Sequence, residues 1–206
     1  MNAPETRIAL PAIGEAFAGG FFAGLIESGG SRFAIIMSPA GEGRHRDTEW
    51  NGHSLETVEG ALSYCDGRAN TKAMAEAGSE VAKWALGRRI ADREDWYIPA
   101  LDELELVYRN LKPTAKENAC YARAGINLHA VPPTLPYTRT EPGQTTAAAF
   151  QAGGEQAIEP GYYWSSTQDA GDSGWAWGQY FGNGDQGHVH KSNEYPALLV
   201  RRELIQ

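Results

Sequence analysis

Two histidines near the C-terminal end of the chain, His188 and His190, are separated by a single residue. In a β-strand this spacing places both imidazoles on one face, where they can bind a transition metal. A metal site would also require a third ligand, or a symmetry-related copy of the chain, to converge on them. We therefore interpret the two residues as polar surface histidines, and we expect no metal or other cofactor.

Other signatures of catalysis are weak or absent. Residues 182–187 satisfy the Gly-x-Gly-x-x-Gly spacing of a dinucleotide-binding loop, but no helix pattern follows, so a hairpin is the better interpretation. Asp169, Asp172 and Asp185 could offer oxygen ligands to calcium, although solvated loop carboxylates are the simpler interpretation. The sequence contains no Gly-x-Ser-x-Gly, His-Glu-x-x-His or Gly-Lys-Ser/Thr motif. We therefore do not expect an enzyme.

The segment around the two histidines has the composition of a recognition surface. Residues 162–191 combine Tyr and Trp with Ser, Gly, Asn, Gln and His, and they carry few charges. Tyr and Trp supply large contact areas with few rotatable bonds, and the small polar residues supply adaptable hydrogen bonds. An aromatic β-sheet core has the same composition, so composition alone leaves both interpretations open.

An alternating pattern predicts how this segment folds. Residues 175–181 alternate as in a strand, and residues 183–184 supply the Asn-Gly step of a two-residue hairpin turn. That turn would place Trp177 opposite His190. Because Trp177 and Phe181 lose most by facing water, we expect both to point inward. The outward set then comprises Gly178, Tyr180, Asp185, Gly187 and one or both histidines. A β-bulge in the return strand would swap its faces.

Length, charge and cysteine content limit the possible classes of protein. A chain of 206 residues with 42% hydrophobic content can bury a core as one domain. We expect an N-terminal arm over residues 1–18, as an attachment segment or a loose tail, and one domain over residues 19–206. The net charge of −8 and pI near 5.1 argue against nucleic acid as a partner.

No apolar run approaches the roughly 18 residues that a membrane helix needs, and the first residues lack the pattern of a signal peptide. We therefore expect the chain to be made and to fold in the cytoplasm, without membrane insertion. Cys65 and Cys120 form no metal or redox motif; a disulfide between them is possible without any support from the pattern.

Hydrophobic periodicity predicts a mixed α+β fold. The predicted strands are residues 21–26, 32–37, 95–99, 162–166, 175–181, 185–191 and 197–200. The predicted helices are residues 71–89, weakened at Gly78, and residues 101–111, with a helical turn in 145–150. Residues 41–47 are expected to be a charged loop, and residues 112–161 a Pro-rich excursion. Because strands occur at both ends of the chain, we expect the termini to pair in one sheet.

Three ordered motifs resemble the signature of a bacterial and phage family with a C-type-lectin-like fold. They are residues 95–99 (Asp-Trp-Tyr-Ile-Pro) followed by 102–104 (Asp-Glu-Leu), residues 163–167 (Tyr-Trp-Ser-Ser-Thr), and the hairpin with the closing strand that contains 200–202 (Val-Arg-Arg). The usual pattern has Arg-Leu where this chain has Tyr97-Ile98. The resemblance implies two helices packed on mixed or antiparallel sheets, with a loop-rich middle.

With its Gly-Leu-Ile hairpin and Pro-rich middle, the chain is also similar to proteins encoded beside phage tail-fibre genes. This similarity implies a receptor-binding protein at the virion tail tip, which binds a host cell-surface glycan or protein and contacts other phage tail proteins. It also implies a homo-oligomer such as a trimer. Carried over from related lectin-like folds, the ligand-binding residues are Gly178, Tyr180, Asp185, Gly187, His188, Val189 and His190.

Two alternatives to an adhesin remain open. The chain could be a structural tail or baseplate component with a lectin-like fold and no receptor contact. It could also cleave surface polysaccharide, but a glycosidase needs two suitably spaced carboxylates, and the sequence identifies no such pair.

Overall fold

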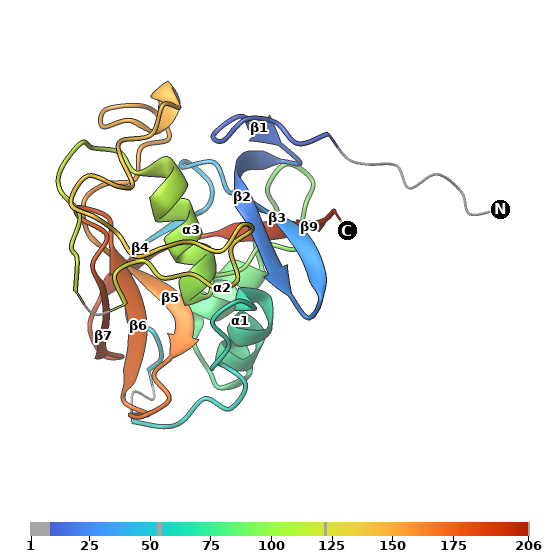
Figure 1. Cartoon of the computed structure of the whole chain (residues 1–206). Helices are drawn as coiled ribbons and strands as arrows, with labels where there is room; N and C mark the ends of the chain where they lie inside the picture. The colour runs from blue at the N-terminus through green and yellow to red at the C-terminus, as the bar shows by residue number, and fades with distance from the viewer. Residues whose placement is uncertain (1–8, 53–54, 122, 206) are drawn as a thin grey trace.

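The computed structural model describes residues 9–52, 55–121 and 123–205, which form an α+β fold as predicted (Figure 1). The helical elements are α1 (Gly67–Glu76), α2 (Glu80–Leu86), α3 (Leu101–Leu111) and the 3-10 turn η1 (Ala148–Phe150). The strands are β1 (Ala16–Phe17), β2 (Gly20–Ser28), β3 (Ser31–Met37), β4 (Arg44–Thr48), β5 (Tyr162–Gln168), β6 (Trp175–Tyr180), β7 (Gln186–His190), β8 (Tyr195–Leu198) and β9 (Val200–Leu204). The pairs formed between these strands are antiparallel.

The first sheet joins the two ends of the chain. Its strand order is β1-β2-β3-β9, and Met37 of β3 lies opposite Val200 of β9. This pairing confirms the predicted N-terminal hairpin and the expectation that the two ends of the chain share a sheet. The strand predicted over residues 197–200 is divided, however, between β8, which pairs with β4, and β9. Within the predicted arm, β1 pairs with β2 and residues 14 and 15 also exchange backbone hydrogen bonds with Phe22 of β2. Residues 1–8 of the arm lie outside the described residues.

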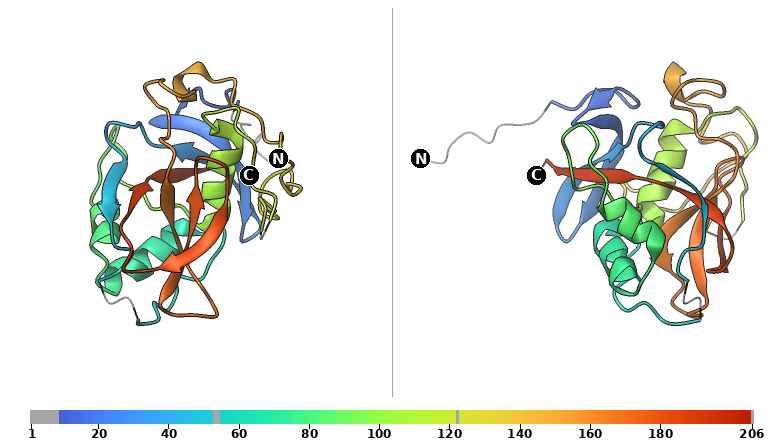
Figure 2. Two further views of the ribbon diagram at one scale, coloured as in Figure 1. Left: turned by 90° about the vertical axis from the view of Figure 1, so that its left-hand side faces the viewer. Right: turned by 180° about the vertical axis from the view of Figure 1, so that it is seen from behind.

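The second sheet has the order β5-β6-β7, so β7 is an edge strand, and β4 and β8 form a separate two-stranded ribbon. Helix α3 packs against β2 of the first sheet and against β5 and β6 of the second (Figures 1 and 2). Helices α1 and α2 pack against each other near the lower end of the molecule in Figure 1. The hairpin that carries the predicted site is therefore held from one side by α3.

Helix α3 coincides with the most regular apolar pattern of the sequence, which confirms that prediction. Its acidic residues are buried too, because each meets hydrogen-bond donors that replace water. The Glu103 carboxylate accepts hydrogen bonds from the Ala100 N–H and the Tyr97 hydroxyl, each at 2.8 Å. Burial raises the pKa of Glu103 to about 7, although the charge of Arg202 acts in the opposite direction.

The single helix predicted over residues 71–89 is wrong, because the chain divides there into α1 and α2. Gly78 has a φ of +95°, which no continuous α-helix contains. The Ser79 hydroxyl then accepts a hydrogen bond from the Ala82 N–H at 3.4 Å and caps α2. The weak point seen in the pattern is thus a break between two helices.

Two further segments differ from prediction. Residues 41–47 were expected as a loop, but β4 begins at Arg44, whose guanidinium donates to the carbonyls of Gln156 and Ala157 at 2.7 and 2.6 Å. A strand this polar has no apolar alternation to reveal it. The strand predicted over residues 95–99 is reduced to an isolated bridge between Tyr97 and Val200.

The Pro-rich excursion over residues 112–161 is ordered, and among its described residues η1 is the one helical element, as predicted. Buried Lys112 anchors it at the end of α3. Its ammonium group donates to the Lys116 carbonyl at 2.5 Å, the Asn118 side chain at 2.7 Å and the Pro142 carbonyl at 3.1 Å. Burial lowers the pKa of Lys112.

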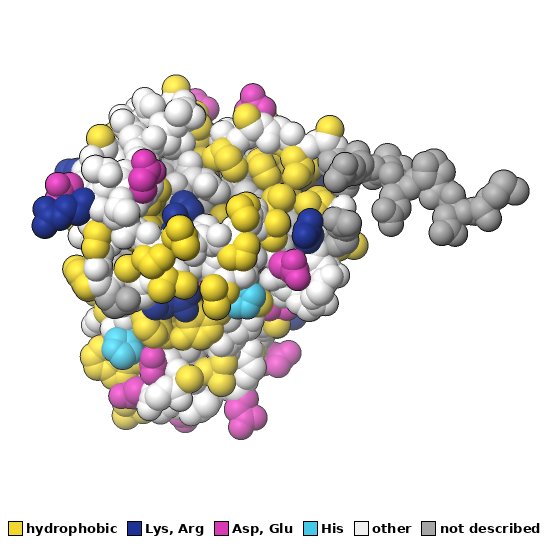
Figure 3. Space-filling model, viewed as in Figure 1, with side chains coloured by type: hydrophobic (Ala, Val, Ile, Leu, Met, Phe, Trp, Pro, Cys, Tyr) yellow, Lys and Arg dark blue, Asp and Glu magenta, His cyan; other side chains and the backbone are white. Residues whose placement is uncertain are grey.

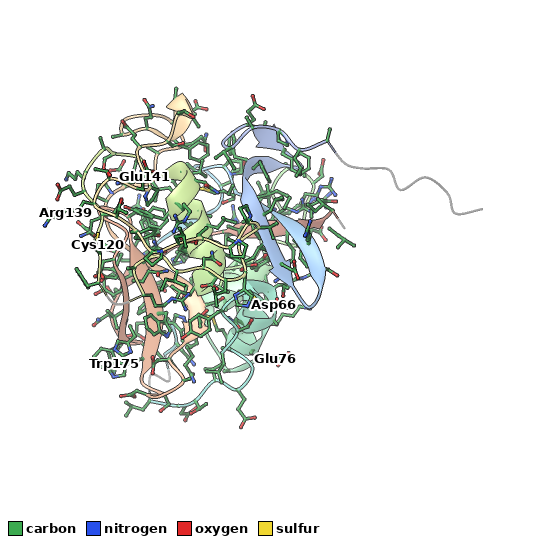
Figure 4. The ribbon with its side chains drawn as sticks, viewed as in Figure 1. Asp66, Glu76, Cys120, Arg139, Glu141 and Trp175 are labelled. Atoms are coloured by element: carbon green, nitrogen blue, oxygen red, sulfur yellow. The ribbon has the colours of Figure 1, made fainter. Side chains whose placement is uncertain are left out.

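Both cysteines are free thiols: Cys65 is partly buried, and Cys120 lies exposed on the excursion near Arg139 and Glu141 (Figure 4). Within the described residues, no helix combines the length and apolarity needed to cross a membrane.

Candidate recognition site

The C-terminal hairpin forms, but its register differs from the prediction. Strands β6 and β7 pair with Trp177 opposite His188 and Gly178 opposite Gly187. The predicted two-residue turn is wrong because residues 181–184 connect the strands, with the residue 180 N–H donating to the residue 185 carbonyl at 2.8 Å. Since the register moves by an even number of residues, each side chain keeps its face and changes only its cross-strand partner.

The predicted ligand-binding residues divide between the two faces of the hairpin. One face holds Gly178, Tyr180, Asp185, Gly187 and Val189, and the other holds His188 and His190. On the first face, the Tyr162 hydroxyl donates to the Asp185 carboxylate at 2.5 Å, and its ring lies 5.5 Å from that of Tyr180. Gly178 was expected to face outward but is buried, because the Tyr163 carbonyl lies 2.9 Å from where a Cβ would stand.

Trp177 and Phe181 were both predicted to point inward, but their environments differ. Phe181 is fully buried, whereas Trp177 is only half-buried, so the prediction is wrong for Trp177. The core covers this face as far as buried Gln179, whose amide donates to the Tyr137 hydroxyl at 3.2 Å. Alternation predicts which face of a strand a side chain occupies. It does not predict how far along that face the rest of the protein buries the side chains.

Beyond that point, five aromatic and imidazole side chains form what we term the aromatic surface: Tyr64, Trp175, Trp177, His188 and His190. The ring of Trp177 stacks on His188 at 5.2 Å, and Trp175 lies 5.4 Å from His188 and 6.0 Å from His190. The ring of Tyr64 flanks Trp177 at 6.4 Å. Figure 4 shows Trp175 at the lower end of β6, and in Figure 3 hydrophobic side chains surround a histidine over this region.

The polar groups of the aromatic surface are organised by Asp169, which follows β5. Its Oδ2 lies 3.0 Å from Nδ1 of His188, and its Oδ1 accepts hydrogen bonds from the N–H groups of Gly171 and Asp172 at 2.8 and 2.9 Å. Burial raises the pKa of Asp169, but the hydrogen bonds from His188 and the backbone outweigh it, and the pKa is lowered overall. This carboxylate is therefore ionised near neutral pH and fixes the His188 ring.

A chain of contacts joins the aromatic surface to α3. The guanidinium of Arg123 lies 4.7 Å from the centre of the Tyr64 ring and donates to Asp102 at 2.5 Å. Asp102, at the start of α3, also lies 2.6 Å from Nδ1 of His129. Burial raises the pKa of Asp102, and the charges of Arg123 and His129 oppose that rise. Sequence reasoning missed Tyr64 and Arg123, because both lie in segments without periodic pattern.

Potential metal ligands do not gather at one place in the part of the chain that the structure describes. They contain no group of three or more His, Cys, Asp or Glu side chains that could hold a metal ion. Asp169, Asp172 and Asp185, considered above as calcium ligands, accept hydrogen bonds from protein groups instead. A separate groove of about 680 Å³ lies between the β2–β3 turn and residues 128–133, and its lining includes His129 and Cys65.

The sequence matches the family described as the Lcl C-terminal domain over residues 44–201. The match includes α1 to α3, the Pro-rich excursion and the whole C-terminal hairpin. Among curated proteins, none matches the chain significantly.

Proposed function

This chain belongs to the family of Lcl C-terminal domains, and we propose that it acts as a receptor-binding protein of a phage tail. In this proposal a C-type-lectin-like domain at the virion tail tip recognises a host cell-surface glycan or protein through its C-terminal hairpin. The observation that carries the proposal is the aromatic surface. Half-buried Trp175 and Trp177 on the central strand β6 stand beside exposed His188 on the edge strand β7, where the core no longer covers the sheet.

The contacts between the resemblance motifs support this assignment, because the motif residues build a frame behind the hairpin. The Leu101 N–H donates to the Thr167 hydroxyl at 3.0 Å, and the Ser166 N–H donates to the Pro99 carbonyl at 2.8 Å. Arg201 of the closing strand pairs with Asp95 at 2.8 Å. The motifs thus act together in folding, which leaves recognition to the side chains that the frame holds outward.

The predicted binding residues take different parts in this proposal. His188 and His190 belong to the aromatic surface, and Val189 lies between them on the edge strand. Tyr180, Asp185 and Gly187 line the opposite face, where Tyr162 covers them in part. Gly178 is buried and acts by letting β5 and β6 approach closely. We assign the primary contact with the receptor to the face that carries the two histidines, and a secondary contact to the opposite face.

Presentation in several copies would strengthen a shallow site of this kind. When one copy has bound, binding of the next becomes an intramolecular event, so weak contacts combine into strong attachment. A homo-oligomer such as a trimer, joined to other phage tail proteins, is therefore part of the proposal. No catalytic step is included in it.

A structural tail or baseplate component is the second candidate, and one observation favours it. The Pro-rich excursion exposes two large apolar side chains, Leu128 and Leu135, at 73% and 81% of their surface. An apolar loop of this kind could pack against a neighbouring virion protein. In that case the hairpin would be protected in the intact particle and accessible in the isolated protein.

Adsorption of the purified protein to a panel of bacterial strains tests the proposal. The test variant is Trp177→Ala with His188→Ala, which removes the stacked pair. The matched control is Trp84→Ala with His45→Ala, another tryptophan–histidine ring pair at 4.7 Å, on α2 and β4. We expect the test variant to lose adsorption and the control to keep it. Loss in neither variant, or no adsorption to any strain by the parent protein, contradicts the proposal.

A further inference from the structure

We propose that the side chains of Lys191 and Gln168 join through an amide bond, a covalent cross-link that closes the sheet carrying the aromatic surface. Gln168 is the last residue of β5, and Lys191 directly follows β7. Because β6 lies between these two strands, the cross-link spans all three. The proposal concerns a modification of this chain and does not depend on the receptor-binding function.

The two reacting groups are already in contact. The Nζ atom of Lys191 lies 2.7 Å from Oε1 of Gln168, and both side chains are buried. Two further contacts hold the Nζ atom, which lies 3.0 Å from the Glu56 carbonyl and 4.6 Å from the centre of the Trp50 ring. Groups fixed in this way react as one molecule, without the entropy cost of bringing two partners together.

The surroundings of Lys191 favour the neutral amine, which is the nucleophilic form. Its contacts among the described residues include no carboxylate that would balance an ammonium charge, and an indole face attracts a cation more weakly. Burial lowers the pKa of Lys191 to about 8, although the charge of Asp172 acts in the opposite direction. Amide formation removes this buried charge altogether.

The carboxamide of Gln168 is polarised towards attack. Besides the contact with Nζ, its Oε1 accepts a hydrogen bond from the Val58 N–H at 2.7 Å. When the amine adds to the carbon bonded to Oε1, negative charge develops on this oxygen. The fixed Val58 N–H then stabilises that charge, as the donors of an oxyanion hole do.

The reaction is balanced by these two side chains alone. The ammonium group first loses one proton to solvent, and the nitrogen lone pair of the amine then forms a bond to the carboxamide carbon. A proton passes from Nζ to the carboxamide nitrogen, and the bond between that nitrogen and the carbon breaks. A primary amine and a primary carboxamide thus become a secondary amide and ammonia.

Lys112 provides an internal contrast. Its Nζ also contacts a carboxamide oxygen, that of Asn118 at 2.7 Å, but it donates as well to the carbonyls of Lys116 and Pro142. Each of its three N–H groups therefore has an oxygen acceptor, which stabilises the protonated form. Lys191 has two such acceptors and an indole ring, so we expect a cross-link at Lys191 and none at Lys112.

The intact mass of the purified, denatured protein is the first test. We expect the parent chain to be lighter than its sequence requires by the mass of one ammonia. Lys191→Arg keeps the positive charge but cannot form this bond, so this variant should have the full mass of its sequence. Lys112→Arg is the matched control and should keep the deficit. A parent chain at its full mass overturns the proposal.

Digestion with a protease that cleaves before aspartate locates the bond, because aspartates separate the two residues in the sequence. The peptide that ends at Gln168 should stay joined to the peptide that begins at Asp185, and Lys191→Arg should release the two separately. Ammonia is also lost when an asparagine cyclises, above all before glycine, as at residues 183–184. A mass deficit with separate peptides therefore overturns the proposal too.

Discussion

The indole ring of Trp177 stacks on the imidazole ring of His188 across β6 and β7, with centroids 5.2 Å apart. This pair unites a residue that was expected in the core with one that was expected at the surface. Both lie where the core stops covering the sheet, and Asp169 contacts Nδ1 of the imidazole at 3.0 Å. The pair therefore forms a small rigid platform, and its contribution to the free energy of unfolding can be measured.

Trp177→Phe should leave the free energy of unfolding unchanged or raise it by up to about 1 kcal/mol, because the indole N–H of Trp177 is covered and has no hydrogen-bond partner among the described residues. Trp164→Phe is the contrasting variant, since its indole N–H donates to the Thr48 carbonyl at 2.8 Å. We expect that variant to lose about 1–3 kcal/mol. Urea denaturation measures both, and equal losses would contradict the difference in pairing.

Asp102→Ala should lower the free energy of unfolding by about 3 kcal/mol, because it leaves Arg123 and His129 without their shared, buried partner. Glu117→Ala removes an ion pair to Arg139 in which both side chains are mostly exposed, and it should cost less than about 1 kcal/mol. Chemical denaturation distinguishes the two. A loss for Asp102→Ala as small as that of the control would show that the link from α3 to Tyr64 contributes little.

Gly184→Ala should be much more damaging than Gly29→Ala, although both glycines have positive φ values of +79° and +59°. The left-handed conformation alone costs an alanine about 1–2 kcal/mol. At Gly29 a Cβ would meet nothing within 4 Å, whereas at Gly184 it would overlap the ring of Tyr108. We expect a loss of about 3 kcal/mol or more at Gly184. Similar melting temperatures for the two variants would refute the packing argument.

Stability should fall at acidic pH in a way that depends on Asp169. Its pKa is lowered in the folded state, so the stabilisation is fully present above the unfolded value near 3.9 and is lost as pH falls through the lower folded value. Asp169→Asn removes this contribution. The difference in unfolding free energy between parent and variant should be constant near neutral pH and shrink below pH about 4. A difference that grows on acidification would contradict the sign.

The sequence predicted those parts of the fold that depend on local, periodic apolar patterns. Helix α3 and the N-terminal hairpin are of this kind, and the pairing of β3 with β9 follows from strands at both chain ends. Strand β4 was not predicted because its side chains are polar and because Arg44 bonds to the carbonyls of Gln156 and Ala157, which lie in a distant loop. Such contacts leave no periodic trace in either segment.

For the candidate site, the sequence identified the hairpin and the division of each strand into faces. It could not give the register, because that depends on a four-residue connection in which Gly184 packs against Tyr108. Nor could the sequence show that burial of this face of β6 extends to Gln179 and not to Trp177, since that depends on Tyr137 in the Pro-rich excursion. The partners Tyr64 and Arg123 reach the site only through the tertiary fold.

The placement of Trp175, Trp177 and His188 outside the buried frame has a consequence for how the chain can evolve. Frame residues such as Trp164 and Thr167 are fully buried, so exchanges there threaten folding itself. The outward residues contribute little to the interior, and exchanges among them carry a small thermodynamic penalty. Substitutions can therefore change the chemistry of the aromatic surface while the buried frame beneath it stays folded.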